Sequence, residues 1–155
     1  MIIDKKNAAQ FCDGLRRRGN KIVFTNGCFD IVHAGHVRYL TAAKNFGDVL
    51  IVGLNTDESV RKLKGSSRPI NNQDDRAEVL LGLKAVDYVI FFGEATAENL
   101  IAEVKPDIYV KGGDYTLETL PEAKIVQSYG GRVELINLVA GRSTTNIIEK
   151  ILAEK

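Results

Sequence analysis

The sequence predicts an α/β protein with a doubly wound, five-stranded, mainly parallel sheet and helices on both faces. Along the whole chain, apolar runs of strand length alternate with segments whose apolar residues recur at helical spacing. The run 49–54 is almost wholly apolar, as expected for a strand that is covered on both faces. This alternation implies right-handed crossovers and therefore a Rossmann-like sheet.

Each predicted element follows from its apolar pattern and from the residues that end it. Apolar residues at helical spacing predict a first helix over 7–18, which Gly19-Asn20 ends. The apolar run inside 21–25 predicts the first strand, and 49–54 the second. The other expected strands are 86–92, 107–111 and 132–138. The other expected helices are 33–47, 57–62, 74–83, 97–104, 121–129 and 144–152.

Composition restricts the class of protein. The chain has 155 residues, 45% of them apolar and 26% charged, which suits a single globular domain over 1–155 with an N-terminal helical segment over 1–20. A net charge of +1 argues against nonspecific nucleic-acid binding. No apolar stretch approaches the ~20 residues that cross a membrane, and the N-terminus lacks a signal-peptide pattern. We therefore expect a cytoplasmic protein with neither a membrane nor a nucleic acid as partner.

Polar residues follow the predicted strands at their carboxyl ends. They lie in the runs 26–36, 55–57, 111–114 and 141–144. Ligands of open α/β sheets bind beyond the carboxyl ends of the strands. We therefore expect these four runs to form one site.

The two histidines of the chain, His33 and His36, lie at the strand-to-helix turn with Gly35 between them. Imidazole donors beside helix N–H groups suit a phosphate whose charge increases during a reaction. The alternatives are a helix-capping histidine with a packed one, and a metal ladder with Asp30. Asp30 is also a candidate to hold Mg²⁺ through water.

Other runs supply phosphate-binding residues. Lys62 and Lys64 precede a Gly-Ser loop and suit a polyphosphate, and Gly141 and Arg142 lead into a helix that Ser143 or Thr144 would cap. Cys28 is a possible nucleophile, although the sequence assures it no basic partner. With no hydride-cofactor fingerprint, the pattern favours nucleotidyl transfer by in-line displacement.

The chain resembles the nucleotidyltransferases that carry a His-x-Gly-His signature, in particular the cytidylyltransferase-like group. The resemblance covers about 21–151. The pattern Gly-x-Phe-Asp-x-x-His-x-Gly-His is matched by Gly27, Phe29, Asp30, His33, Gly35 and His36, and a later Ser-Thr-Thr element by 143–145. Within the group, further motifs are similar to those of the adenylyltransferases that make ADP-heptose; they lie at 25–27, 63–65, 68–69, 85–87, 110–115 and 141–148.

The resemblance implies a reaction of ATP with D-glycero-β-D-manno-heptose 1-phosphate, with Mg²⁺ as cofactor and ADP-heptose for the lipopolysaccharide inner core as product. It implies His33, His36 and Lys64 as catalytic residues, and a homodimer through 85–90. The nucleotide-binding set that it implies, together with the polar runs, is Asn26, Gly27, Cys28, Phe29, His33, Gly35, His36, Lys62, Lys64, Lys111, Asp114, Gly141, Arg142, Ser143 and Thr144.

Two other functions fit the same residues. One is a cytidylyltransferase that acts on glycerol 3-phosphate or another alcohol phosphate, because base choice depends on backbone groups and pocket shape. The other is a regulatory nucleotide-binding module without activity. A silent binder has no need of a transition-state apparatus, so the histidines and lysines favour an enzyme.

Overall fold

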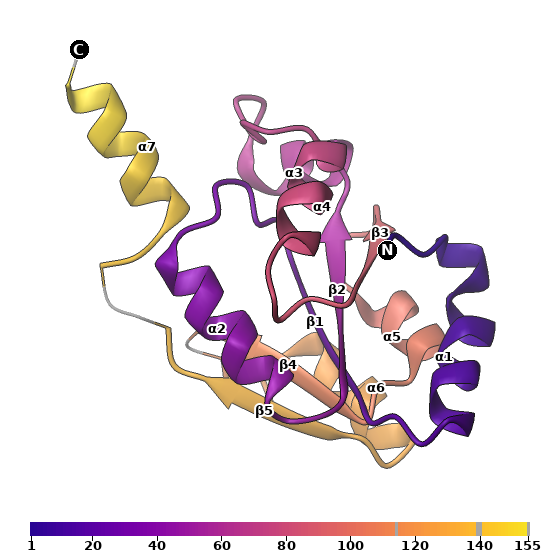
Figure 1. The fold of residues 1–155 in the computed structure, drawn as a ribbon. Coiled ribbons are helices and arrows are strands. Elements are labelled where there is room, and N and C mark those ends of the chain that lie inside the picture. Colours follow the sequence, from indigo (N-terminus) through magenta and orange to yellow (C-terminus); the bar gives the residue numbers. More distant parts are fainter. Residues whose placement is uncertain (114, 139–140, 155) are drawn as a thin grey trace.

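The computed structural model describes residues 1–113, 115–138 and 141–154. It contains a five-stranded sheet in the order β3-β2-β1-β4-β5, in which each neighbouring pair is parallel (Figure 1). The predicted doubly wound α/β fold is confirmed. The strands are β1 (Ile22–Gly27), β2 (Val49–Asn55), β3 (Tyr88–Phe92), β4 (Ile108–Gly112) and β5 (Arg132–Ile136).

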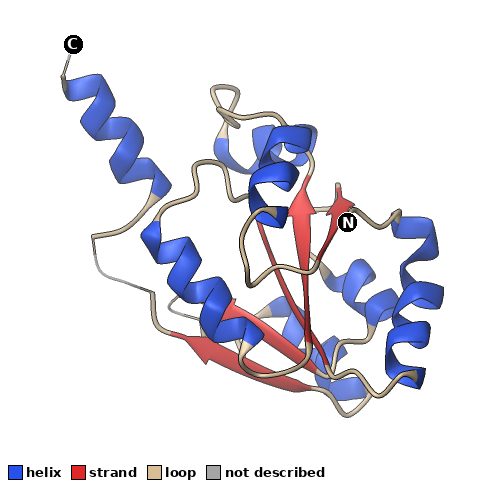
Figure 2. Ribbon diagram, viewed as in Figure 1, coloured by secondary structure: helices blue, strands red, loops and turns tan. Residues whose placement is uncertain are grey.

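Each expected helix is present, with ends that differ by a few residues from the prediction (Figure 2). The difference that matters is in α3, which continues to Lys64 where a helix only to residue 62 was expected. The helical elements are the 3₁₀ turn η1 (Lys5–Asn7), α1 (Ala8–Arg17), α2 (Ala34–Lys44), α3 (Asp57–Lys64), α4 (Gln73–Leu81), α5 (Glu98–Val104), α6 (Pro121–Ser128) and α7 (Thr144–Ala153).

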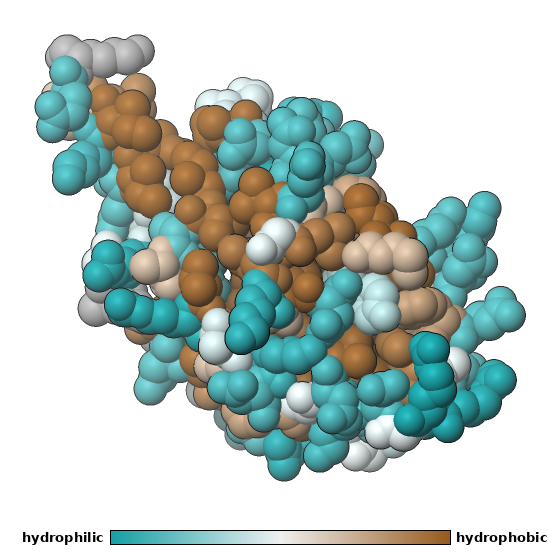
Figure 3. All heavy atoms as spheres, viewed as in Figure 1, coloured by the Kyte–Doolittle hydropathy of each residue, from teal (hydrophilic) through white to brown (hydrophobic). Residues whose placement is uncertain are grey.

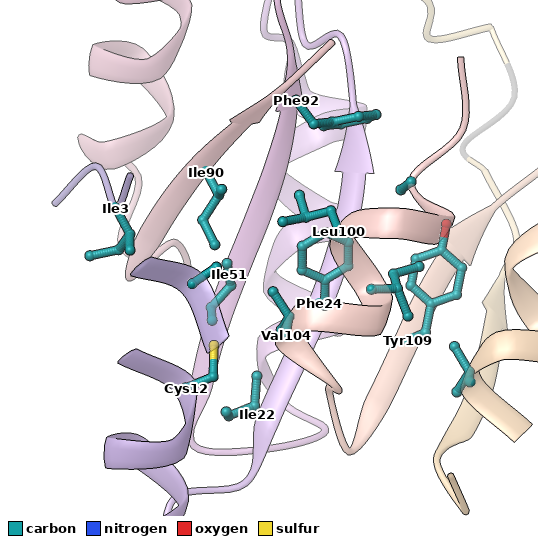
Figure 4. Close-up of a cluster of buried hydrophobic side chains, with 14 of the residues drawn as sticks. Ile3, Cys12, Ile22, Phe24, Ile51, Ile90, Phe92, Leu100, Val104 and Tyr109 are labelled. Carbon is teal, nitrogen blue, oxygen red and sulfur yellow. The ribbon is translucent and has the colours of Figure 1, made fainter. Parts of the chain in front are cut away.

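The central strands bury side chains on both faces, which explains why their sequences are so apolar. Ile22 and Phe24 of β1 belong to a core with α1, α5 and α6 (Figure 4). Val23, which points to the opposite face, belongs to a second core with α2 and α4. The helices therefore form a layer on each side of the sheet.

The strand order places a switch point between β1 and β4. From β1 the chain adds β2 and β3 on one side, and then returns to add β4 and β5 on the other. The connections diverge here, which leaves a crevice at the carboxyl ends of the two strands. The loop after β1 leads directly into α2 (Figure 1).

Helix α7 projects away from the sheet (Figure 1). None of its described residues is buried, and Ile151 and Leu152 are 59% and 58% exposed. In the space-filling view its apolar side chains form a brown band along the projecting helix (Figure 3). Only the first turn of α7 approaches the crevice, through contacts described below.

The first residues of the chain cover the outer edge of β3. The N–H of Ile3 donates to the carbonyl of Val89 at 2.9 Å, and the N–H of Val89 donates to the carbonyl of Met1 at 3.2 Å. In the segment 85–90, expected as a dimer contact, Val89 and Ile90 are fully buried in the protein's own core. No helix within the described residues is long and apolar enough to span a membrane.

Candidate active site

A cavity of about 710 Å³ occupies the crevice and contains most of the predicted site residues. Lys62 and Gly141 are not among its lining residues, and Asp114 lies outside the described residues. The predicted residues that line it are Asn26, Gly27, Cys28, Phe29, Asp30, His33, Gly35, His36, Lys64, Lys111, Arg142, Ser143 and Thr144.

The two histidines hold the start of α2. His33 is the N-cap residue, and its Nδ1 accepts the backbone N–H of Gly35 at 3.0 Å. His36 reaches back, and its Nδ1 accepts the backbone N–H of His33 at 3.3 Å. Together the two bonds form a capping box built from imidazoles. The capping alternative and the phosphate-binding alternative are therefore compatible.

These bonds determine where each ring carries its proton. An Nδ1 atom that accepts an N–H has no hydrogen of its own, so a neutral ring must carry its proton on Nε2. The two rings stack with centroids 3.9 Å apart, and both residues line the cavity. His33 and His36 thus offer a pair of Nε2–H donors from adjacent positions.

The environment keeps both imidazoles neutral. Burial lowers the pKa of His33, and the positive charge of Arg142 lowers it further. Burial lowers the pKa of His36 to about 4, with a smaller contribution from His33. At neutral pH the pair therefore acts as hydrogen-bond donors rather than as fixed cations.

Gly35 allows the histidine turn and the start of α7 to lie in contact. A Cβ added at Gly35 would lie 2.8 Å from Cε1 of His33 and 3.1 Å from Cβ of Arg142. Any side chain here would displace one of the two. The glycine of the signature is therefore explained by close packing.

The start of α7 brings a second helix N-terminus to the cavity. Ser143 is its N-cap residue and accepts the backbone N–H of Asn146 at 3.0 Å. The hydroxyl of Thr144 donates to the carbonyl of Ile31 at 3.1 Å, which ties α7 to the loop before α2. With Arg142 beside them, these residues form an anion-binding end of the cavity.

The two lysines predicted for the site lie in different surroundings. Residues two positions apart on a helix point to different sides, and α3 extends through both. Lys64 lines the cavity. Lys62 pairs with Glu58 at 3.2 Å on the exposed surface, where its side chain is 72% exposed. The structure thus brings only Lys64 to the site.

Asp30 holds a loop. Its carboxylate accepts the backbone N–H groups of Ile70 and Asn71 at 2.8–2.9 Å and the guanidinium Nε of Arg68 at 2.8 Å. Burial alone would raise the pKa of Asp30, but these donors hold it below its ordinary value. Since both oxygens are engaged by the protein, the geometry gives the expected magnesium role no support.

Arg76 was missed by the sequence analysis. This residue of α4 is 1% exposed and donates to the carbonyls of Cys28, Asn55 and Asn71 at 2.8–3.0 Å, and to the carboxylate of Asp57 at 2.8 Å. It therefore joins the segments that follow β1 and β2. Exposed acidic residues (Asp74, Asp75 and Glu78) stand close to it in the sequence, so no local signal marks its burial.

Cys28 takes part in the site through its backbone carbonyl. Its carbonyl is bound by Arg76, and its Sγ lies 3.7 Å from Oδ1 of Asn55. Burial raises the pKa of its thiol above the ordinary value. A thiolate nucleophile is therefore disfavoured at this position.

Comparison with known proteins agrees with this geometry. The model of the family described as "Cytidylyltransferase-like" matches residues 24–150. The chain belongs to the cytidylyltransferase-like family. The predicted nucleotidyltransferase class is thereby confirmed.

Relatives within this family are highly similar. The bifunctional protein HldE of Syntrophotalea carbinolica is 59% identical over 88% of this chain, and that of Pseudomonas fluorescens is 58% identical over 90%. The chain spans 28% and 29% of the lengths of these relatives. The crystal structure of the lipopolysaccharide core biosynthesis protein from Thermoplasma volcanium is 31% identical, with a TM-score of 0.64, and the match covers 78% of this chain and 98% of that one.

Proposed function

We propose that this protein is an adenylyltransferase that transfers AMP from ATP to D-glycero-β-D-manno-heptose 1-phosphate and releases pyrophosphate. The observation that carries the proposal is the pair of Nε2–H donors on His33 and His36 beside the start of α7. The similarity to HldE proteins and to a lipopolysaccharide core biosynthesis protein supports the heptose as acceptor.

In the proposed reaction, an oxygen of the sugar phosphate attacks the α-phosphorus of ATP. The new P–O bond forms as the bond from the α-phosphorus to the bridging oxygen breaks, and that oxygen leaves with pyrophosphate. Negative charge on the α-phosphoryl oxygens is then stabilised by the Nε2–H groups of His33 and His36. The protein thus works by positioning and by charge stabilisation.

The anion-binding residues would contact the leaving group of the reaction. Arg142, Ser143 and the N–H groups at the start of α7 would bind the β- and γ-phosphates. Lys64, which also lines the cavity, would neutralise the same phosphates. The proposed roles of these residues therefore differ from that of the histidines, which serve the reacting phosphorus.

Magnesium is proposed only as a companion of ATP. No group of three His, Cys, Asp or Glu side chains among the described residues could hold a metal ion, and Asp30 is engaged by the protein. The side chains therefore do not fit a resident Mg²⁺ site. Mg²⁺ would enter on the phosphate oxygens, which it binds well.

We further propose that 1–155 folds as one domain, that it acts in the cytoplasm where ATP is available, and that it forms a homodimer. The homodimer is supported by the sequence resemblance alone, since the buried segment 85–90 offers little free surface. Light scattering of the purified chain measures its mass in solution. A monomer at all concentrations would contradict the dimer without affecting the proposed chemistry.

The proposed activity is tested by pyrophosphate release. ATP and CTP are each offered with the heptose 1-phosphate and with glycerol 3-phosphate, in the presence of Mg²⁺. We expect turnover with ATP and the heptose phosphate. Turnover only with CTP would contradict the adenylyl assignment, and nucleotide binding without turnover would favour a regulatory module.

A further inference from the structure

The cavity also contains a carboxylate and an ammonium group that the proposed mechanism does not use. Glu122, at the start of α6, is 5% exposed and lines the cavity. Lys111, near the end of β4, lines it too. Within the described part of the chain, no ion pair joins them. Two opposite charges are thus held near each other without direct contact.

One carboxylate oxygen of Glu122 makes a hydrogen bond within the fold, and the other makes none to the described residues. Oε1 accepts the backbone N–H of Ala97 at 3.3 Å, which links α6 to the start of α5. Among the described residues, no donor contacts Oε2, and no fully buried side-chain oxygen lacks a hydrogen-bond partner. Glu122 lines the cavity, so Oε2 is the carboxylate oxygen left to meet a ligand there.

Lys111 is electrostatically coupled to this carboxylate. Burial lowers the pKa of Lys111, and the charge of Glu122 opposes that effect. Its Nζ lies 5.8 Å from the ring centroid of Tyr115, which also lines the cavity. The lining thus offers both an acceptor and a donor, and Thr96 and Thr119 are among its other polar residues.

The cavity is therefore lined by two groups of residues with different chemistry. A triphosphate fits the end with Arg142 and Ser143, but a carboxylate such as Glu122 would repel it. A ligand group that both donates and accepts hydrogen bonds without carrying charge fits Glu122 and Lys111. Hydroxyl groups meet this requirement.

The geometry of in-line displacement indicates which of the two substrates places its hydroxyl groups near Glu122. The entering and leaving oxygens lie on opposite sides of the reacting phosphorus. The leaving pyrophosphate is assigned to Arg142 and Ser143, which lie against α2 through Gly35. Glu122 belongs to α6, and α6 covers the opposite face of the sheet from α2. The acceptor therefore enters from the side of Glu122.

We propose that Glu122, with Lys111, forms the subsite that binds the hydroxyl groups of the acceptor's sugar ring. Glu122 accepts from ring hydroxyls through Oε2, and Lys111 donates to an adjacent one. The subsite thereby selects a hydroxylated ring over a simple alcohol phosphate. This inference rests on the proposed function, because it places the acceptor by the in-line geometry of that reaction.

The test compares Glu122→Gln with Glu118→Gln, a control at an exposed glutamate outside the cavity lining. Gln keeps an oxygen for the N–H of Ala97 and removes the charge, and equal urea midpoints would show that the fold is retained. Calorimetry measures binding of the heptose 1-phosphate and, separately, of a non-hydrolysable ATP analogue. We expect Glu122→Gln to weaken sugar-phosphate binding roughly 10-fold or more, as for loss of a hydrogen bond to a charged group. We expect ATP-analogue binding to change by less than about twofold.

The other outcomes overturn the inference in distinguishable ways. Equal weakening of both ligands, or of the ATP analogue alone, would assign the subsite to the ribose of the nucleotide. Unchanged binding of both would leave Glu122 a role in the fold alone. If the wild-type chain binds mannose 1-phosphate or glucose 1-phosphate but not the heptose, the proposed function fails, and the same variant on that sugar still tests the subsite. A wild-type chain that binds no sugar phosphate overturns both.

Discussion

Nδ1 of His36 accepts the backbone N–H of His33, and Nδ1 of His33 accepts that of Gly35. Each imidazole is thereby divided into a nitrogen that holds the helix and a nitrogen that is left to donate. The same bonds that begin α2 also place the proton of each neutral ring on Nε2. Loss of either nitrogen should therefore have a distinct effect.

Two substitutions of His36 separate these effects. In His36→Asn the side-chain oxygen can take the place of Nδ1, but no donor replaces Nε2–H. We expect near wild-type stability and a kcat about 10²–10³-fold lower, as for loss of a transition-state donor. His36→Gln places an amide near Nε2 and loses the cap, at a cost of ~1 kcal/mol. Pyrophosphate release and urea unfolding measure both, and an Asn variant with wild-type kcat would contradict the assignment.

The histidines should also make stability depend on pH. The folded protein keeps His36 neutral down to about pH 4, whereas in the unfolded chain it takes up a proton near 6.5. Between these values the unfolded state binds more protons, so stability falls as the pH falls. Urea midpoints from pH 7.5 to 4.5 should decrease more in the wild-type chain than in His36→Asn. Parallel curves would show that His36 is not held neutral by the fold.

Gly35 and Gly14 form a matched pair. Gly35→Ala would place its Cβ within 2.8 Å of the His33 ring, so we expect kcat to fall about 10–100-fold through misplacement of that ring. Gly14, in α1, has nothing within 4 Å of an added Cβ. Gly14→Ala should therefore raise stability by ~0.5–1 kcal/mol with unchanged kcat. An active Gly35→Ala variant would contradict the close packing that we describe.

Arg76 should be the most sensitive charged residue of the scaffold. Arg76→Met leaves the carbonyls of Cys28, Asn55 and Asn71 and the carboxylate of Asp57 without this donor, so we expect a loss of roughly 3–5 kcal/mol in the free energy of unfolding. Arg61→Met, on the exposed side of α3, should change it by less than about 0.5 kcal/mol. Urea denaturation followed by circular dichroism measures both, and similar midpoints would rule out the role of Arg76.

The fold was readable from the sequence because its signals are local. The central strands are apolar throughout since both faces are buried, and helix caps such as Ser143 lie next to the helices that they begin. The convergence of polar runs at the switch point followed from the alternation of elements. A parallel sheet thus determines much of the site's position.

The side chains whose contacts the sequence analysis did not predict depend on distant partners. Arg76 lies beside exposed acidic residues, and its burial depends on carbonyls 5 to 48 positions away. Asp30 meets a loop about 40 positions further along. Such contacts are set by tertiary packing, so they cannot be predicted from the local sequence pattern.

The short N-terminal segment along β3 has a consequence for handling the protein. A bare edge strand is a template on which other chains can add, and aggregation begins there. Main-chain bonds from Met1 and Ile3 occupy this edge, while the opposite edge strand, β5, carries the ion pair of Arg132 with Glu134. Trimming the first three residues would uncover an apolar edge. Protein prepared for crystallisation or assays should therefore retain Met1–Ile3 and carry any purification tag at the other end of the chain.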